Sequence, residues 1–235
     1  IDLSKVFVQM KLTVIDDEDE AESMKEDIAK YANKQSAVQS SDFVSKHPIH
    51  REIEKHSRSE WAPPSENFAI PTKWFYERTR GQYQTRILAL KTPSKASQFK
   101  AENPKEQMFT KIDMAKFENT WRMRPWEVAI GGQDHLGKKI GPILVKEWEQ
   151  NPANFGIMFF KDLVAKAILF RTADSSIGKS AWYKAQIGLK AQTSTYTIAY
   201  LRYQLNKQGK DINLQRIYKS QKLSETLLNQ ILYLA

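Results

Sequence analysis

The sequence holds 235 residues, with 36 Lys or Arg against 27 Asp or Glu, so its formal net charge is +9. Its 41% of hydrophobic residues is too high for a disordered chain, and the absence of cysteine excludes disulfides, cysteine-ligated zinc, iron–sulfur clusters and thiol catalysis. The longest apolar runs, such as residues 167–170, fall far short of the roughly 20 residues that a membrane-spanning helix needs, and no signal peptide opens the chain. We therefore expect a cytoplasmic protein without membrane contact.

The N-terminal part of the chain is patterned as one strand and two helices. Residues 6–15 alternate with a period of two, which is typical of a strand. The acidic run at 16–20 then favours the start of a helix that ends near Asn33. A second helix spans residues 41–61, with an interruption at Pro48.

Helical patterns predominate in the rest of the chain. Residues 91–105, rich in Pro, Ser and Lys, are expected to form an exposed loop. Residues 193–205 are β-branched and aromatic enough to be ambiguous, and we interpret them as a buried helix because they exceed the usual strand length. The remaining predicted helices follow from apolar residues at helical spacing, and they are 109–121, 140–149, 157–171 and a final stripe of Leu223, Leu227, Ile231 and Leu234.

The predicted fold class is mainly α, a helical bundle-like module with one N-terminal strand. Because a single strand needs partners, we expect it to join a sheet in a missing N-terminal region. The chain begins with Ile1 rather than Met, and we expect it to be a piece of a larger protein. We divide it into residues 1–70, the end of a preceding α/β region, and residues 71–235, a basic, mainly helical C-terminal domain.

The charge is unevenly distributed along the chain. Residues 1–70 have a net charge of −5, whereas residues 71–125 and residues 126–235 each have a net charge of +7. An acidic head followed by a basic body indicates a polyanionic partner such as nucleic acid. The alternative is a lysine-rich surface that serves solubility alone.

Motifs for catalysis or cofactor binding are scarce. The restriction-enzyme type of nuclease core needs Asp/Glu-x-Lys to hold Mg²⁺ and polarise water, and none of the 27 acidic residues has Lys two positions later. Residues 173–180 match a relaxed phosphate-loop pattern, although we favour the C-terminal turn of a helix over a nucleotide site. His47, His50 and His56 lie close together, and we favour packing or surface roles over a metal site. We expect no cofactor, no metal and no catalytic residue in this chain.

The most distinctive segment is residues 73–83, KWFYERTRGQY, which combines aromatic rings with arginines. Arginine binds phosphate with two parallel hydrogen bonds, and aromatic faces stack on bases. The alternative is that Glu77 pairs with Arg78 or Arg80 while Trp74 and Phe75 enter the core. The predicted nucleic-acid-binding residues, with Trp74 and Tyr83 as stacking groups, are Lys73, Trp74, Arg78, Arg80, Tyr83, Arg86, Lys111 and Lys116.

Four blocks of sequence resemble the abortive infection phage resistance (AIPR) family. They are YANKQSAV at 31–38 with SDF at 41–43, KWFYERTRGQY at 73–83, KIDMAKFENTW at 111–121, and FKDLVAKAILF at 160–170 with Trp182-Tyr183. The resemblance implies a bacterial antiphage protein of which this chain is a C-terminal piece, following an N-terminal region likened to restriction endonucleases. The segment 125–133, PWEVAIGGQ, departs from the family pattern, and no catalytic residue is carried over.

These observations lead to competing hypotheses about function. The first is a non-catalytic module that binds DNA or RNA for an antiphage effector, whose full-length form is a candidate nuclease. The second is a structural, oligomerisation or regulatory module that controls the N-terminal region and has no nucleic-acid contact of its own. A phosphodiesterase without a recognisable motif is the third. The expected partners are nucleic acid, the missing N-terminal region and a second copy of the chain.

Overall fold

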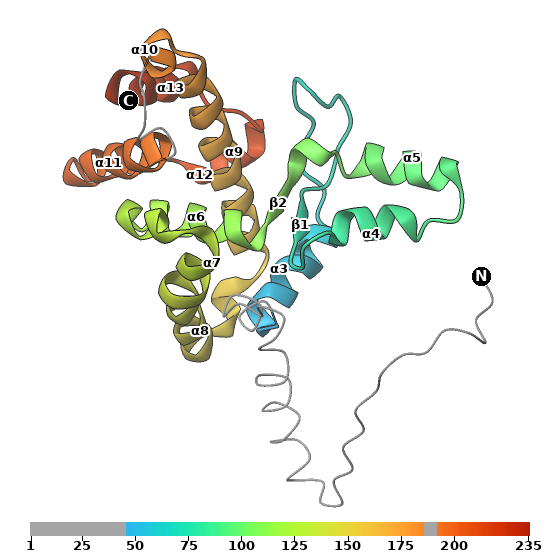
Figure 1. Ribbon diagram of the computed structural model, residues 1–235. Coiled ribbons are helices and arrows are strands. Elements are labelled where there is room, and N and C mark those ends of the chain that lie inside the picture. Colours follow the sequence, from blue (N-terminus) through green and yellow to red (C-terminus); the bar gives the residue numbers. More distant parts are fainter. Residues whose placement is uncertain (1–45, 186–191) are drawn as a thin grey trace, which may run out of the picture. The chain divides into compact units, whose positions relative to one another are not determined.

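The structure is a computed structural model, and it describes residues 46–185 and 192–235. All of these described residues belong to one compact unit, residues 39–235 (Figure 1). The predicted N-terminal strand and the helix that follows it lie outside the described residues. Our division of the chain after residue 70 stays a prediction.

Helices dominate the described part of the chain, which confirms the predicted mainly α fold class. The α-helices are α3 (Pro48–Ser59), α4 (Gln82–Leu88), α5 (Pro93–Glu102), α6 (Lys111–Trp121), α7 (Gly132–His135), α8 (Gly141–Gln150), α9 (Ile157–Lys179), α10 (Ala181–Ala185), α11 (Thr193–Lys207), α12 (Leu214–Ser220) and α13 (Glu225–Leu234). Short 3₁₀ segments are η3 (Lys105–Gln107), η4 (Pro125–Ile130) and η6 (Pro152–Phe155), and η5 (Leu136–Ile140) is a π-helical turn. The strands are β1 (Phe75–Glu77) and β2 (Met108–Thr110).

Helix α9 is the centre of the packing. Its residues 163–170 are all buried, and it contacts α3, α6, α11, α12 and α13 (Figure 1). A helix that is buried around most of its circumference must be apolar on several faces, as the run LVAKAILF is, except for Lys166. The predicted helix at 157–171 is therefore confirmed, and it continues to Lys179.

Two parallel strands of three residues each were not predicted. Phe75, Tyr76 and Glu77 pair with Met108, Phe109 and Thr110, respectively. Strands this short carry no period-of-two pattern, so the sequence offered no signal for them. Their buried rings, Tyr76 and Phe109, lie 5.3 Å apart between centroids and join this small sheet to the core.

The prediction of an exposed loop at 91–105 is wrong, because residues 93–102 form helix α5. Pro93 occupies the first turn, where its fixed backbone angle suits a helix, and the Thr92 side chain accepts a hydrogen bond from the Lys95 amide at 3.3 Å. Helix α5 has no buried residue, which explains why it has no apolar stripe. It runs beside α4, and together they form a helical hairpin that projects from β1 (Figure 1).

Pro48 is the first residue of helix α3. It lies in the first turn of α3, and the His47 Nδ1 atom accepts a hydrogen bond from the Ile49 amide at 3.4 Å. Any helical part before residue 46 lies outside the described residues. The predicted helix at 193–205 is confirmed as α11. Of the final apolar stripe, Leu227, Ile231 and Leu234 lie on α13, and the buried Leu223 precedes that helix. No helix among residues 46–185 and 192–235 combines the length and the apolar character needed to cross a membrane.

Candidate nucleic-acid interface

The first part of the distinctive segment 73–83 lies in the hydrophobic core. Trp74, Phe75 and Tyr76 are buried, as the alternative interpretation expected for Trp74 and Phe75. The Arg58 guanidinium lies 3.5 Å from the centroid of the Phe75 ring and donates a hydrogen bond to the Tyr76 carbonyl oxygen at 3.0 Å. The aromatic half of the segment therefore fastens β1 to α3.

Glu77 organises the turn that follows. Its carboxylate accepts hydrogen bonds from the backbone amides of Gly81 at 3.0 Å and Tyr83 at 3.1 Å. Gly81 has a φ of 81°, a conformation that residues with a side chain rarely adopt. These backbone contacts hold the turn at the start of α4.

Neither predicted stacking group exposes its ring. Trp74 is 5% exposed, and its Nε1 atom donates a hydrogen bond to Gln221 Oε1 at 2.9 Å. Tyr83 is 6% exposed, and its hydroxyl donates to the Asn103 carbonyl oxygen at 2.7 Å. A base cannot reach either ring face in this structure, so we leave both residues out of the functional proposal below.

Three of the predicted phosphate-binding cations are engaged inside the protein. The Nε atom of Arg78 donates to Glu54 Oε2 at 2.8 Å. Lys111 is buried, and the Lys116 ammonium lies 4.4 Å from the centroid of the Phe170 ring. Arg78 and Lys116 thus contact side chains that lie far from them in the sequence.

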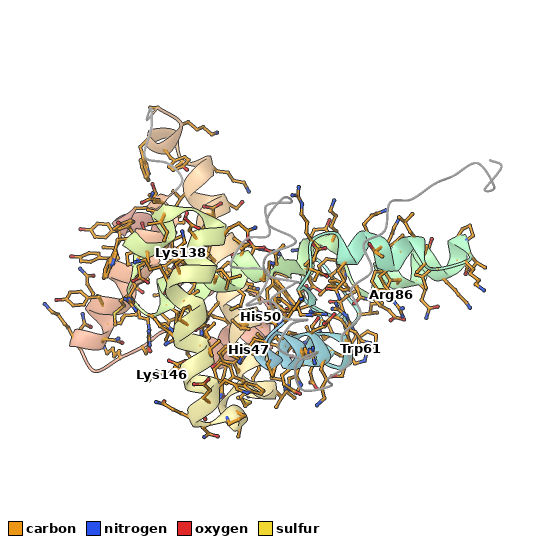
Figure 2. The ribbon with its side chains drawn as sticks, turned by 60° about the horizontal axis from the view of Figure 1, so that its bottom comes forward. His47, His50, Trp61, Arg86, Lys138 and Lys146 are labelled. Carbon is orange, nitrogen blue, oxygen red and sulfur yellow. The ribbon has the colours of Figure 1, made fainter. Side chains whose placement is uncertain are left out.

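The other cations of the predicted set remain accessible to different degrees. The half-buried Lys73 places its ammonium 4.2 Å from the centroid of the Trp61 ring. Arg80 and Arg86 are exposed at the base of the α4–α5 hairpin and on α4, and Figure 2 shows Arg86 on that hairpin. The structure thus leaves Arg80 and Arg86 as the predicted residues that face solvent directly.

Further exposed cations extend this pair along the hairpin. The hairpin and its C-terminal flank carry two carboxylates. Glu102 accepts a hydrogen bond from Gln98 at 2.9 Å, and the exposed Glu106 lies just beyond α5. The lysines of residues 91–105 were not among the predicted binding residues, although their charge was visible in the sequence. The exposed cations of the hairpin and its flanks are Arg80, Arg86, Lys91, Lys95, Lys100 and Lys105.

The three neighbouring histidines do not form a metal site. The ring Nδ1 of His50 shares a hydrogen bond of 2.5 Å with the Tyr76 hydroxyl, and burial lowers the pKa of His50 to about 3. His47 packs edge-on against Trp148 at 6.0 Å between centroids, and His56 stacks near Phe160. Figure 2 shows His47 and His50 at neighbouring places on and before α3. Within residues 46–185 and 192–235, no group of three or more His, Asp or Glu side chains could hold a metal ion.

The phosphate-loop alternative at 173–180 is wrong. Residues 173–179 continue helix α9, which ends with Ser180 as its C-cap. Their backbone amides therefore take part in helical hydrogen bonding and cannot cradle a phosphate. The favoured interpretation, the last turns of a helix, is confirmed.

Sequence reasoning missed a cluster of buried and partly buried charges that lines a cavity of about 430 Å³. The Lys166 ammonium donates to Glu118 Oε1 at 2.5 Å, and both side chains are buried. Arg122 binds both carboxylate oxygens of Glu147, at 2.6 and 2.7 Å. Burial raises the pKa of the nearby Asp162. Each of these cations has a carboxylate partner, so the cluster joins α6, α8 and α9 through balanced charges.

The signal for this cluster was present in the third and fourth sequence blocks, 111–121 and 160–170. Glu118 and Lys166 belong to those blocks, but 48 positions separate them, and only the packing of α6 on α9 brings them together. A charged position within an otherwise apolar helix is the feature that could have identified Lys166.

Comparison with known proteins gives one match. No curated protein and no solved structure matches this chain. The family model described as AIPR protein matches residues 1–235, the whole chain. Because that match includes the four blocks and the residues that form the core around α9, the chain belongs to the AIPR family, which is named for abortive infection and phage resistance.

Proposed function

We propose that this chain is a non-catalytic module that binds nucleic acid for an antiphage protein. Membership of the AIPR family indicates a role in abortive infection. The observation that carries the more specific proposal is the α4–α5 hairpin. Three of its six exposed cations, Arg86, Lys95 and Lys100, lie on the two helices, the other three flank them, and the only buried residue of the two helices is Tyr83. A cytoplasmic location belongs to the same proposal, because the nucleic acid of an infecting phage enters the cytoplasm.

The spacing of the cations on the hairpin suits phosphate contacts. Lys95 and Lys100 lie five residues apart on α5, which is about 7.5 Å along the helix axis, while Arg86 adds a charge from α4. A nucleic-acid backbone carries one phosphate per about 3.4 Å of each strand, so the spacing of Lys95 and Lys100 corresponds to about two phosphate steps. Phosphate contacts provide affinity without sequence preference.

The test is a fluorescence-anisotropy titration of the whole chain with labelled DNA and RNA, single- and double-stranded, at several salt concentrations. In the test variant, Arg80, Arg86, Lys95 and Lys100 are each changed to Glu. A control variant, Lys139→Glu with Lys219→Glu, reverses two exposed charges outside the hairpin. We expect the hairpin variant to lose more than about tenfold in affinity and to show a smaller slope of log K against log salt.

Equal affinity and equal salt slope for the hairpin variant and the unmodified chain would overturn the proposal. Absence of binding to any of the four nucleic acids at low salt would favour the alternative, a structural or regulatory module without nucleic-acid contact. The final apolar stripe gives that alternative little support, because Leu223 and Ile231 are buried within the described unit rather than offered to a partner.

A further inference from the structure

Helix α11 has one face in the core and another that exposes aromatic rings. Its inward residues, such as Ile198 and Leu201, are buried. On the opposite side, Tyr196, Tyr200 and Tyr203 are 45%, 51% and 45% exposed. Residues at positions i, i+4 and i+7 lie on one side of a helix, so these tyrosines form a continuous stripe. Packing against the core does not explain why these three large aromatic side chains are exposed to solvent.

The stripe has the spacing of a stacking platform. With a rise of about 1.5 Å per residue, its tyrosines follow one another at about 6 Å and about 4.5 Å along the helix axis. The Tyr200 and Tyr203 rings are nearly parallel, with an interplanar angle of 24° and centroids 6.4 Å apart. Two nearly parallel, exposed rings offer faces on which successive bases of a strand can stack.

The charges at the stripe favour a polyanion. The Lys207 ammonium lies 4.7 Å from the centroid of the Tyr203 ring, and hydrogen bonding to the Tyr203 hydroxyl raises the pKa of Lys207. Lys210 follows just beyond the helix and is exposed. Residues 193–207 contain no Asp or Glu, so no carboxylate on α11 repels a phosphate.

We propose that the tyrosine face of α11, formed by Tyr196, Tyr200 and Tyr203 with Lys207, binds single-stranded nucleic acid by stacking on its bases. Single strands expose base faces, whereas a duplex covers them with neighbouring bases, so aromatic side chains select the unpaired form. This inference rests on the proposed function and specifies its ligand as single-stranded. The hairpin and α11 lie at opposite sides of the residue 39–235 unit in Figure 1, so their contributions are separable.

The experiment compares three variants of the whole chain with the unmodified protein. The first changes Tyr196, Tyr200 and Tyr203 to Ala, the second changes the same residues to Phe, and the third changes Tyr233 to Ala as a matched control. Tyr233 lies on α13 and is 88% exposed, so its loss removes an exposed ring away from the stripe. The probes are a fluorescent 20-nucleotide oligothymidylate and a 20-base-pair DNA duplex.

We expect the triple Ala variant to bind the oligothymidylate at least about tenfold more weakly and the duplex with unchanged affinity. The salt slope should stay the same, because no charge is removed. The triple Phe variant should keep most of its affinity, since it keeps the rings, and Tyr233→Ala should bind like the unmodified chain. If the triple Ala variant fails to fold, Tyr200→Ala alone is expected to weaken oligothymidylate binding about fivefold or more.

Two outcomes would overturn the inference while leaving the proposed function intact. One is unchanged binding of the oligothymidylate by the Ala variants together with lost binding by the hairpin charge variant. The other is a mass in sedimentation that falls from dimer to monomer in the triple Ala variant, because the stripe would then be an interface between copies. Failure of the proposed function differs from both, since the unmodified chain would then bind none of the four nucleic acids, single- or double-stranded DNA or RNA, at low salt.

Discussion

Lys166 is a charged residue within the most deeply buried part of α9. Its ammonium bonds to the Glu118 carboxylate on α6, and the Trp121 ring centroid lies 5.4 Å away. Removing one member of a buried ion pair leaves the other without compensation, whereas removing both can be nearly neutral. The pair is therefore expected to matter far more than an exposed one.

We predict that Glu118→Gln lowers the free energy of unfolding by about 3–5 kcal/mol, because it leaves the buried Lys166 charge unpaired. The double variant Glu118→Gln with Lys166→Met should recover most of that loss. Glu66→Gln is the matched control, since it breaks the exposed pair with Lys222 and should cost less than about 1 kcal/mol. Urea unfolding curves check all three, and equal losses for Glu118→Gln and Glu66→Gln would contradict the prediction.

At the scale of elements, the packing of α7 on α6 depends on a glycine, Gly132, which has no Cβ atom. A Cβ atom added at Gly132 would lie 2.5 Å from the Cγ2 atom of Ile112. That distance is far inside van der Waals contact, and Cγ2 is too close to the backbone to move freely. Gly132 belongs to the segment 125–133, which departs from the expected family pattern. In this structure Gly132 allows α7 to lie close to α6.

We predict that Gly132→Ala destabilises the protein by about 1–3 kcal/mol through overpacking. Gly178→Ala is the control, because nothing lies within 4 Å of its added Cβ and it lies inside α9, where alanine stabilises a helix by about 0.5–1 kcal/mol. Thermal unfolding followed by circular dichroism measures both. In a double-mutant cycle, Ile112→Ala should partly offset Gly132→Ala, and strict additivity of the two changes would refute the proposed contact.

At the scale of the whole molecule, buried neutral histidines make stability depend on pH. Burial, with the nearby His47, Lys111 and Arg78, lowers the pKa of His50 to about 3, and burial near Lys116 lowers that of His135 to about 4. Both values lie below the about 6.5 of an unfolded chain, so the unfolded state binds more protons in between. Stability is full above about pH 6.5 and is lost as the pH falls toward the folded-state values.

We predict that His50 alone lowers the free energy of unfolding by about 2 kcal/mol between pH 7 and pH 5, and that His135 adds a loss of the same sign. His50→Gln should reduce the slope of stability against pH over this range, whatever its effect at pH 7. Urea unfolding at pH 7, 6 and 5 provides the measurement. Parallel pH profiles for the variant and the unmodified chain would show that His50 is not the group responsible.

Local patterns in the sequence predicted the elements whose residues repeat with helical spacing. Helices α6, α8, α9 and α13 were found in this way, because each buries part of its surface. Helix α11 was recognised instead by its length, which exceeds that of a usual strand. Helix α5 was missed because it buries nothing, although Thr92 and Pro93 carried its capping signal. The strands were missed because three residues are too few for a pattern to emerge.

The candidate site was only partly predictable for a related reason. The positive charge of Arg80 and Arg86 could be read directly from the sequence. Arg78 lies in the same segment and carries the same charge, but it is bound by Glu54 of α3. Tyr83 and Tyr200 are the same residue type with opposite surroundings, one buried and one half exposed. Composition specifies what a side chain can do, and packing decides whether a ligand can reach it.

By itself, the sequence determined the helical character of this protein, its basic body, its lack of cysteine chemistry and, through four blocks, its AIPR family. These properties are sums over the chain or repeats over a few residues, so local information is sufficient for them. Only the tertiary structure decided which cations face solvent, which charges pair inside and which tyrosines form a stripe. Those outcomes depend on contacts such as Trp74 with Gln221, 147 positions apart, and no local pattern encodes a contact between distant segments.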